Sequence, residues 1–506
     1  MTETLPLDGS SLTLEQFLAV TRGGCGVSLV PPAWEAVRAA RGSVERVARD
    51  GRAVYGVTTG FGRFADVTIP APEVDALQVN LIRSHSSGVG PALPEELVRG
   101  MMLLRLNAFA RGHSGVRPEL VQALVDALNR RLYPFVPEQG SVGASGDLAP
   151  LAHLALALLG EGECITPDGR RVAAAQCLAD NGLTPVTLRA KEGVALINGT
   201  SLMTSYLAFS LADARQLLVA AEAAISMSWD ALGGSLQPLD DRVGILRNLP
   251  EQRAVASRLR GLLEGSQLAA APDRPHPQDP YTLRCAPQVL AAVELALGWG
   301  RTVVDGELNA VSDNPLVFPG DEFVSAGNFH GQPLALALDT LAIAVQYLAG
   351  YSERRVARLV DPATNGGLPA FLASQPGLTS GFMIAQYLQA ALVVENAGLA
   401  HPASAISLPT SAEQEDFNSQ GATAGAKLRR LLANSERVVA VEWIVAAQAL
   451  EARRPAAGGS GSERALRALR GLVPPLAADR PLGGDIERVA RALHDGELLR
   501  AARLLP

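Results

Sequence analysis

The sequence has few of the residues that bind metals or form disulfides. Its 506 residues include four cysteines and seven histidines. The cysteines stand far apart and none has the C-x-x-C spacing, so the pattern indicates neither a zinc knuckle nor a disulfide framework. No two histidines have the spacing of metal ligands on one helix. We therefore expect no metal site in this protein.

An excess of positive charge and an apolar leader are also lacking. The net charge is −7 and no basic run stands out, so nucleic acid is not an expected partner. The first residues are acidic and carry no apolar core of a signal peptide, which predicts a cytoplasmic protein. The longest apolar run, 333–351, contains Asp339 and Gln346. We interpret it as a buried helix and expect no membrane partner.

Apolar residues in helical patterns are abundant, and hydrophobic residues make up 48% of the chain. The spacing of these residues predicts long helices at 201–231, 287–310, 333–359, 381–400 and 421–452. Shorter helices are expected at 33–50, 73–87, 94–111 and 117–131. The prediction is a mainly α fold with a long-helix bundle core.

Short extended segments and turns are expected between the helices. A strand is predicted at 53–57, and hairpins around 164–172 and 319–321. The Gly-rich segment 455–461 is interpreted as a flexible connector before short C-terminal helices. We predict a smaller mixed N-terminal domain at 1–200 and a long-helix core and oligomerisation domain at 201–506.

The stretch EQGSVGASGDLAP, residues 138–150, stands out because it places three glycines within seven residues. Glycine tolerates sharp backbone bends, and an apolar helix follows. The simplest interpretation is a turn in which Asp147 caps that helix. A serine-hydrolase elbow is excluded, because G-x-S-x-G requires glycine where Asp147 stands.

A third interpretation of this loop uses the backbone itself. In Ala144-Ser145-Gly146 the Gly146 nitrogen could attack the Ala144 carbonyl and close a five-membered ring. Glycine suits this reaction because it adds no side-chain bulk. Loss of water from the ring and from Ser145 would leave an exocyclic methylene, which is a strong electrophile.

The segment GSVGASGDLAPLAHLA resembles the loop of the aromatic amino acid ammonia-lyases and aminomutases. In that family the tripeptide becomes 4-methylidene-imidazol-5-one (MIO). The resemblance implies that Ala144, Ser145 and Gly146 form MIO and that no diffusible cofactor is used. It also implies a fumarase/aspartase-like helical architecture and a homotetramer whose active sites draw on three subunits.

Separated motifs extend the resemblance over nearly the whole chain. Tyr55, in VYGVTTGFG, matches the family's catalytic tyrosine, although a tyrosine base needs a lowered pKa or alkaline conditions. In QDPYTLRC, Arg284 matches the residue that binds the substrate carboxylate, where a guanidinium can make two parallel bonds. The other residues that the resemblance assigns to the substrate pocket are Gln278 and Tyr281 in the same motif, Asn198 in ALINGT and Phe329 in GNFHGQ.

Two residues bear on the choice of substrate. His85, in NLIRSHSSG, and Glu415, in QED, resemble the histidine branch of the family. Together they are expected to offer a substrate imidazole one donor and one acceptor. The segment 413–421 departs from that branch, because it reads EQEDFNSQG where the usual pattern is NQEDHVSMG. Phe417 and Asn418 resemble the phenylalanine branch instead.

The leading hypothesis is elimination of ammonia from L-histidine, a small-molecule amino acid substrate, to give urocanate. A lyase or 2,3-aminomutase acting on tyrosine or phenylalanine stays open as the alternative. The third hypothesis is a helical assembly protein without catalytic activity. The intact tripeptide, Tyr55 and Arg284 argue against it.

Overall fold

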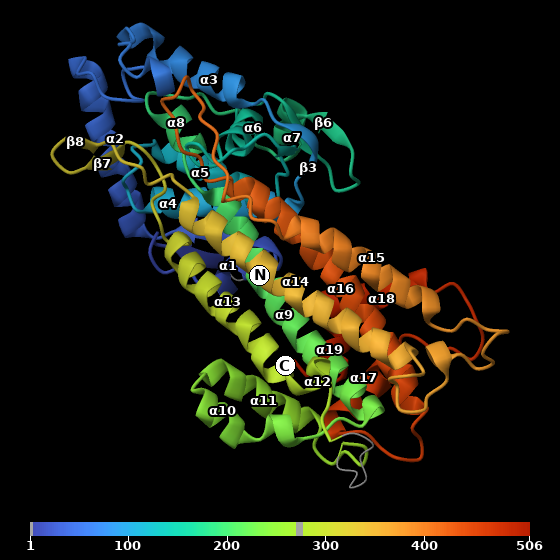
Figure 1. Cartoon of the computed structure of the whole chain (residues 1–506). Helices are drawn as coiled ribbons and strands as arrows, with labels where there is room; N and C mark the ends of the chain where they lie inside the picture. Colours follow the sequence, from blue (N-terminus) through green and yellow to red (C-terminus); the bar gives the residue numbers. More distant parts are fainter. Residues whose placement is uncertain (1–3, 270–276, 506) are drawn as a thin grey trace. The chain divides into compact units, whose positions relative to one another are not determined.

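The computed structural model describes residues 4–269 and 277–505, and helices dominate it (Figure 1). The mainly α prediction is confirmed. Five long helices lie within one or two turns of their predicted bounds: α9 (Ser201–Leu232), α13 (Ala286–Glu307), α14 (Gln332–Val360), α15 (Met383–Leu399) and α16 (Gly421–Glu451). By length and composition α14 could cross a membrane, but 61% of its apolar window is buried within the protein. Burial of this kind is typical of a core helix.

The chain divides into two compact units, each made of segments that are separate in the sequence. Unit 1 comprises Met1–Phe209, Arg301–Leu338 and Pro402–Ala426. Unit 2 comprises Ser210–Gly300, Asp339–His401 and Lys427–Pro506. The predicted domains, 1–200 and 201–506, are each continuous in the sequence, whereas these two units are not. The division into those two domains therefore stays a prediction.

Unit 1 contains the shorter N-terminal helices and all of the strands within the described residues. Its helices are α1 (Leu14–Thr21), α2 (Pro31–Asp50), α3 (Val74–His85), α4 (Glu95–Ala110), α5 (Pro118–Asn129), α6 (Leu148–Leu158), α7 (Ala174–Asp180) and α8 (Glu192–Ile197). Proline begins α2 and α5, where its missing N–H costs no hydrogen bond. The helices α3, α6 and α8 pack against one another (Figure 1). They position most of the candidate site.

Four two-stranded sheets complete unit 1. The pairs are β1 (Thr4–Leu7) with β2 (Gly26–Leu29), β3 (Val89–Ala92) with β4 (Pro137–Gln139), β5 (Glu163–Ile165) with β6 (Arg171–Ala173), and β7 (Leu316–Phe318) with β8 (Glu322–Val324). The first pair is parallel and the others are antiparallel. The last two pairs confirm both predicted hairpins.

The strand predicted at 53–57 is wrong. Residues 55–58 form turns, in which the amides of Val57 and Thr58 both donate to the carbonyl of Val54. The Thr58 hydroxyl further accepts from the Val54 amide at 2.9 Å and donates to the Arg52 carbonyl at 2.6 Å. Local hydrogen bonds therefore replace the partner strand that the β-branched residues suggested.

Unit 2 contains α10 (Asp241–Arg247), α11 (Pro250–Leu262), α12 (Tyr281–Arg284), α15, α17 (Ser460–Arg470), α18 (Gly483–His494) and α19 (Glu497–Ala501). The segment 455–461 is not a free connector, and this prediction is wrong. Gly459 donates to Asp230 at 2.8 Å, and a Cβ at Gly459 would lie 2.4 Å from the backbone of Leu263. The glycines here allow close packing rather than flexibility.

Candidate active site

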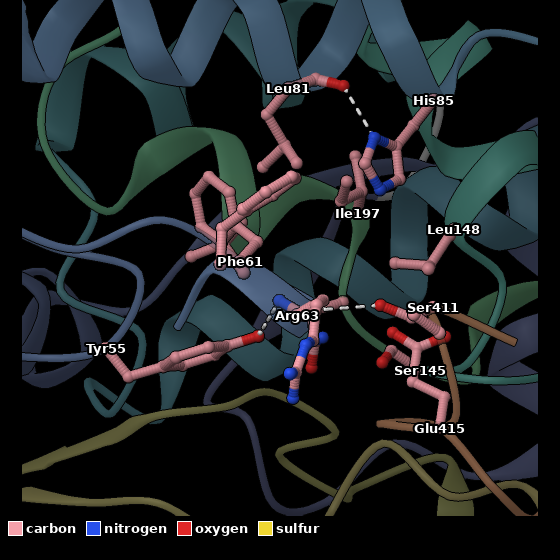
Figure 2. Close-up of a pocket in the computed structure, with 15 residues that line it drawn as sticks. Tyr55, Phe61, Arg63, Leu81, His85, Ser145, Leu148, Ile197, Ser411 and Glu415 are labelled. Atoms are coloured by element: carbon pink, nitrogen blue, oxygen red, sulfur yellow. Dashed lines mark hydrogen bonds between the residues drawn. The ribbon is translucent and has the colours of Figure 1, made fainter. Parts of the chain in front are cut away.

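A cavity of about 410 Å³ in unit 1 brings together five residues that the sequence singled out (Figure 2). They are Tyr55, His85, Ser145, Asn198 and Glu415. A second cavity of about 300 Å³ shares His85 and Glu415 with the first and is lined by the other two tripeptide residues, Ala144 and Gly146. The tripeptide therefore faces both cavities.

The tripeptide loop is held against a second segment of the chain. Gly146 has φ +80° and forms a bridge with Gly199, whose carbonyl accepts from the amide of Asp147 at 2.7 Å. A Cβ at Gly146 would lie 2.2 Å from the Gly199 carbonyl oxygen. Glycine is thus required at position 146 by both its backbone angle and its neighbour.

Asp147 does not cap its own helix, so that expectation is wrong. Its side chain makes no capping bond to α6. Instead it accepts from the amides of Leu202 at 2.8 Å and Met203 at 3.1 Å, in the first turn of α9. Burial raises the pKa of this carboxyl to about 7, against the lowering effect of those two amides and of Arg105. The loop and α9 are thereby tied together.

Asn198 directly follows the last residue of α8 and is held through its backbone. Its carbonyl accepts from the guanidinium of Arg105 at 2.7 Å, and the same nitrogen donates to the carbonyl of Ala195 at 3.0 Å. Arg105 is buried on α4, and nothing in its sequence context signalled this role. The side-chain oxygen of Asn198 is buried and has no partner among the described residues. Asn198 itself lines the main cavity.

Tyr55 reaches the cavity from the turns after α2. Its phenol oxygen accepts from the Gly62 amide at 3.3 Å, and its ring meets Phe61 edge-on at a centroid distance of 6.2 Å. Burial raises the pKa of Tyr55 above its ordinary value, the Gly62 amide opposes this, and the charge of Glu415 adds to it. The lowered pKa that a neutral-pH base would need is therefore not produced by these neighbours.

His85 ends α3 and presents one edge of its ring to the helix. Its Nδ1 lies 2.9 Å from the carbonyl oxygen of Leu81 (Figure 2). Burial lowers the pKa of His85, against the raising effects of the Leu81 carbonyl and of Glu415. A neutral ring with its proton on Nδ1 leaves Nε2 as an acceptor. In this tautomer His85 Nε2 and the Glu415 carboxylate both accept, and the expected pair of one donor and one acceptor stays a prediction that requires the other tautomer.

Glu415 stands at the end of a tight loop, 410–415. Its Oε2 accepts from the hydroxyl of Thr410 at 2.9 Å. The two departures from the histidine pattern lie just beyond it, and neither lines the two cavities. The Phe417 ring stacks on His330 at a centroid distance of 6.2 Å, while Asn418 is buried.

Four predicted residues lie elsewhere. Gln278, Tyr281 and Arg284 belong to unit 2, where the Arg284 guanidinium lies 4.5 Å from the Tyr281 ring and donates to the Asp279 carbonyl at 2.9 Å. Gln278 lines a separate cavity of about 250 Å³. Phe329 belongs to unit 1 but lines none of these cavities. Their roles at the substrate remain predictions.

Sequence reasoning missed the apolar wall of the main cavity, which is formed by Phe61, Leu81, Leu148, Val194 and Ile197. These residues come from α3, α6, α8 and the loop after Tyr55. Each has the ordinary apolar character of a core position, so no sequence signal separates it from the core. A ring-shaped substrate fits such a wall.

Comparison with known proteins identifies the family of this chain. The aromatic amino acid lyase model matches residues 12–471. The chain belongs to the aromatic amino acid lyase family. It is 51% identical, over 494 residues and 97% of both chains, to a histidine ammonia-lyase of Symbiobacterium thermophilum. The resemblance inferred from the separated motifs is confirmed.

Solved structures of this family share the fold. The tyrosine aminomutase of Streptomyces globisporus is 38% identical, with a TM-score of 0.93 over 99% of this chain and 98% of that one. The histidine ammonia-lyase of Trypanosoma cruzi is 40% identical, with a TM-score of 0.91 over 99% of this chain and 96% of that one. The expected helical architecture is confirmed.

Proposed function

We propose that this aromatic amino acid lyase eliminates ammonia from L-histidine to give urocanate. The observation that carries the proposal is the meeting of His85 and Glu415 in one cavity with Tyr55 and Ser145. A phenyl ring would leave both polar groups unpaired, whereas an imidazole ring donates an N–H to one acceptor in its neutral form and to both when it is protonated. The 51% identity with a histidine ammonia-lyase supports the same substrate.

The tripeptide loop fits MIO, the group that the family uses. Only glycine is accommodated at position 146, next to the carbonyl of Gly199. Asn198, whose buried side-chain oxygen has no partner among the described residues, lines the same cavity. We propose that Ala144, Ser145 and Gly146 form MIO without a diffusible cofactor. MIO supplies an electrophilic carbon that takes up the electron pair of the substrate amine and so makes ammonia a better leaving group.

The chain's own side chains would bind the substrate and move its proton. Glu415 accepts an imidazole N–H, and the apolar wall holds the ring plane. The Asn198 side-chain oxygen accepts from the substrate's amino group. Tyr55 removes a proton from Cβ, so that the Cβ–H and Cα–N bonds break, the Cα–Cβ double bond forms, and ammonia leaves.

We also propose a homotetramer with shared active sites. Arg284, the proposed carboxylate partner, is not among the residues that line the Tyr55 cavity, so another copy is expected to supply it. Exposed apolar residues on α15, namely Ile384, Tyr387 and Val394, suit contact between copies. The four cysteines are free thiols, which supports the proposed cytoplasmic location.

A tyrosine lyase or aminomutase is the second candidate, favoured by the likeness to the Streptomyces globisporus enzyme. The positions of Phe417 and Asn418 weaken it, because neither residue lines the cavities. The deciding experiment is a panel of L-histidine, L-tyrosine and L-phenylalanine with identification of products. Urocanate as the fastest product supports the proposal. Faster release of coumarate, cinnamate or a β-amino acid overturns it.

A further inference from the structure

The loop that carries Glu415 is closed and strained. Thr410 and Glu415 exchange two backbone hydrogen bonds, of 2.9 and 3.2 Å. Between them Ser411, Ala412 and Glu413 have φ of +51°, +52° and +66°. Left-handed angles in three consecutive residues other than glycine are unfavourable. They persist only where surrounding contacts hold the backbone in place.

The closing pair is also joined through side chains. The Thr410 hydroxyl donates to Glu415 Oε2 at 2.9 Å. Because the hydroxyl proton is used in this bond, the Thr410 oxygen can only accept from other partners. Thr410 and Glu415 both line the second cavity, together with His85. The orientation of the Glu415 carboxylate toward the substrate cavity therefore depends on where Thr410 is held.

Asn418 holds Thr410 from the buried side. Its side-chain amide donates to Thr410 Oγ1 at 3.4 Å and to the Leu408 carbonyl. Its own backbone amide donates to Ser407 Oγ at 2.6 Å. Asn418 is 1% exposed and lines none of the cavities. Its contacts therefore reach the loop from buried residues and not from the cavity surface.

We propose that Asn418 is a positioning residue for substrate specificity, acting on Glu415 through Thr410. The hydrogen bonds run in one direction, from the Asn418 amide to the Thr410 hydroxyl to the Glu415 carboxylate, so each bond polarises the next. The inference rests on the proposed function, in which Glu415 accepts an imidazole N–H. Position 418 departs from the pattern of the histidine branch. In this proposal the asparagine at that position supports the loop and does not contact the substrate.

Two substitutions remove one hydrogen bond each from the series Asn418–Thr410–Glu415, and neither changes the charge of the cavity. Thr410→Val removes the hydroxyl at constant shape, and Asn418→Leu removes the amide at similar volume. Each should lower kcat/KM for L-histidine about tenfold, mainly through KM, with little change for L-phenylalanine. Thr410→Ser keeps the hydroxyl and should retain most of the wild-type value.

A double-mutant cycle with Glu415→Ala separates positioning of Glu415 from general loss of stability. In the Glu415→Ala background, Thr410→Val and Asn418→Leu should each cost less than about twofold, because the acceptor that they position is absent. A tenfold loss in that background, or equal losses on all substrates, overturns the proposal. Should Asn418→Leu fail to fold, the Thr410→Val and Thr410→Ser pair decides the outcome.

A matched control is available in unit 2. Asn365 is also fully buried and donates its side-chain amide to the Leu359 and Pro369 carbonyls. Its side-chain oxygen has no partner in the part of the chain that the structure describes. Asn365→Leu should lower the melting temperature without changing the ratio of kcat/KM between substrates. If wild type forms no urocanate, the proposed function fails, and the same cycle on the substrate it does use still decides whether Asn418 and Glu415 are coupled.

Discussion

His85 donates its Nδ1 proton to the carbonyl oxygen of Leu81, 2.9 Å away on the same helix. A carbonyl oxygen can only accept, so this contact selects the tautomer. Burial lowers the pKa of the ring, which keeps it neutral at assay pH. The cavity therefore presents two acceptors, His85 Nε2 and the Glu415 carboxylate, rather than a donor and an acceptor.

His85→Leu should shift selectivity away from histidine. Removing the Nε2 acceptor should lower kcat/KM for L-histidine about tenfold, while phenylalanine is unaffected or improved, because an unpaired buried group costs about 1–3 kcal/mol. Urocanate and cinnamate formation are measured side by side. His401→Leu, at an exposed histidine that lines none of the described cavities, should leave the ratio unchanged. An unaltered ratio in His85→Leu would contradict the assignment.

Tyr55 predicts an alkaline pH dependence. The phenol must be ionised to act as base, and its pKa is raised by burial and by Glu415, so kcat/KM should climb with pH between about 8 and about 10. Tyr55→Phe should lower kcat by orders of magnitude. Glu415→Gln should move the alkaline limb to lower pH, because it removes a charge that opposes ionisation. Asp416→Asn serves as the neighbouring-charge control, and a profile flat over this range excludes Tyr55 as the base.

Gly146→Ala should prevent formation of MIO. A Cβ there would lie 2.2 Å from the Gly199 carbonyl oxygen, so the loop cannot keep its closed conformation. Intact-mass measurement of wild type should show the loss of two water molecules. Gly146→Ala should keep its full encoded mass, and Ser145→Ala, which has no side-chain hydroxyl to eliminate, should lose one water molecule at most. Gly169→Ala, in an open hairpin turn, controls for glycine replacement at positive φ. A wild-type chain at full mass would refute the mechanism.

Asp147 should make stability depend on pH. Its pKa is about 7 in the folded chain and about 3.9 in the unfolded chain, so the native state binds the extra proton between these values. The resulting stabilisation is complete below about pH 4 and is lost as pH rises through about 7. Asp147→Asn keeps an acceptor for the α9 amides and should flatten the pH dependence of the urea midpoint. Asp180→Asn, at an exposed carboxylate, should leave the dependence intact; equal slopes in wild type and Asp147→Asn would disprove the claim.

Shared active sites predict complementation between inactive variants. Tyr55→Phe and Arg284→Lys should each be weakly active alone, the second because a point charge replaces the bidentate fork. Co-expression should restore activity if another copy supplies Arg284, since some sites then receive both native residues. Tyr55 and Ser145 line one cavity in a single chain, so Tyr55→Phe with Ser145→Ala should not complement. The hydrodynamic mass should correspond to a tetramer, and an active monomer would exclude active sites shared between copies.

Periodicity predicted the long helices because their apolar residues repeat over many turns. It failed at 53–57, where the β-branched Val54 and Val57 suggested a strand. There the hydroxyl of Thr58 satisfies the backbone locally, and no partner strand is needed. Hairpins with Asp-Gly or Pro-Gly-Asp turns were predictable because turn chemistry is local.

Motif order predicted five members of one cavity, yet it gave no account of what positions them. Asp147 illustrates the reason. Its spacing suits a cap on the following helix, but its carboxylate bonds the first turn of α9, more than fifty residues along the chain. The buried guanidinium of Arg105 likewise bonds the carbonyls of Ala195 and Asn198, about ninety residues along the chain. Such long-range partners carry no signal in a single sequence.

The bridge between Gly146 and Gly199 has a consequence for the time at which the electrophile forms during synthesis and folding. A ribosome has made the tripeptide well before it makes Gly199, so the nascent loop lacks the segment against which it is held. We expect the electrophile to mature only after that segment has docked. Newly made chains would then reach chaperones and small thiols with an ordinary serine at position 145, and the reactive group would arise where the folded cavity already shields it.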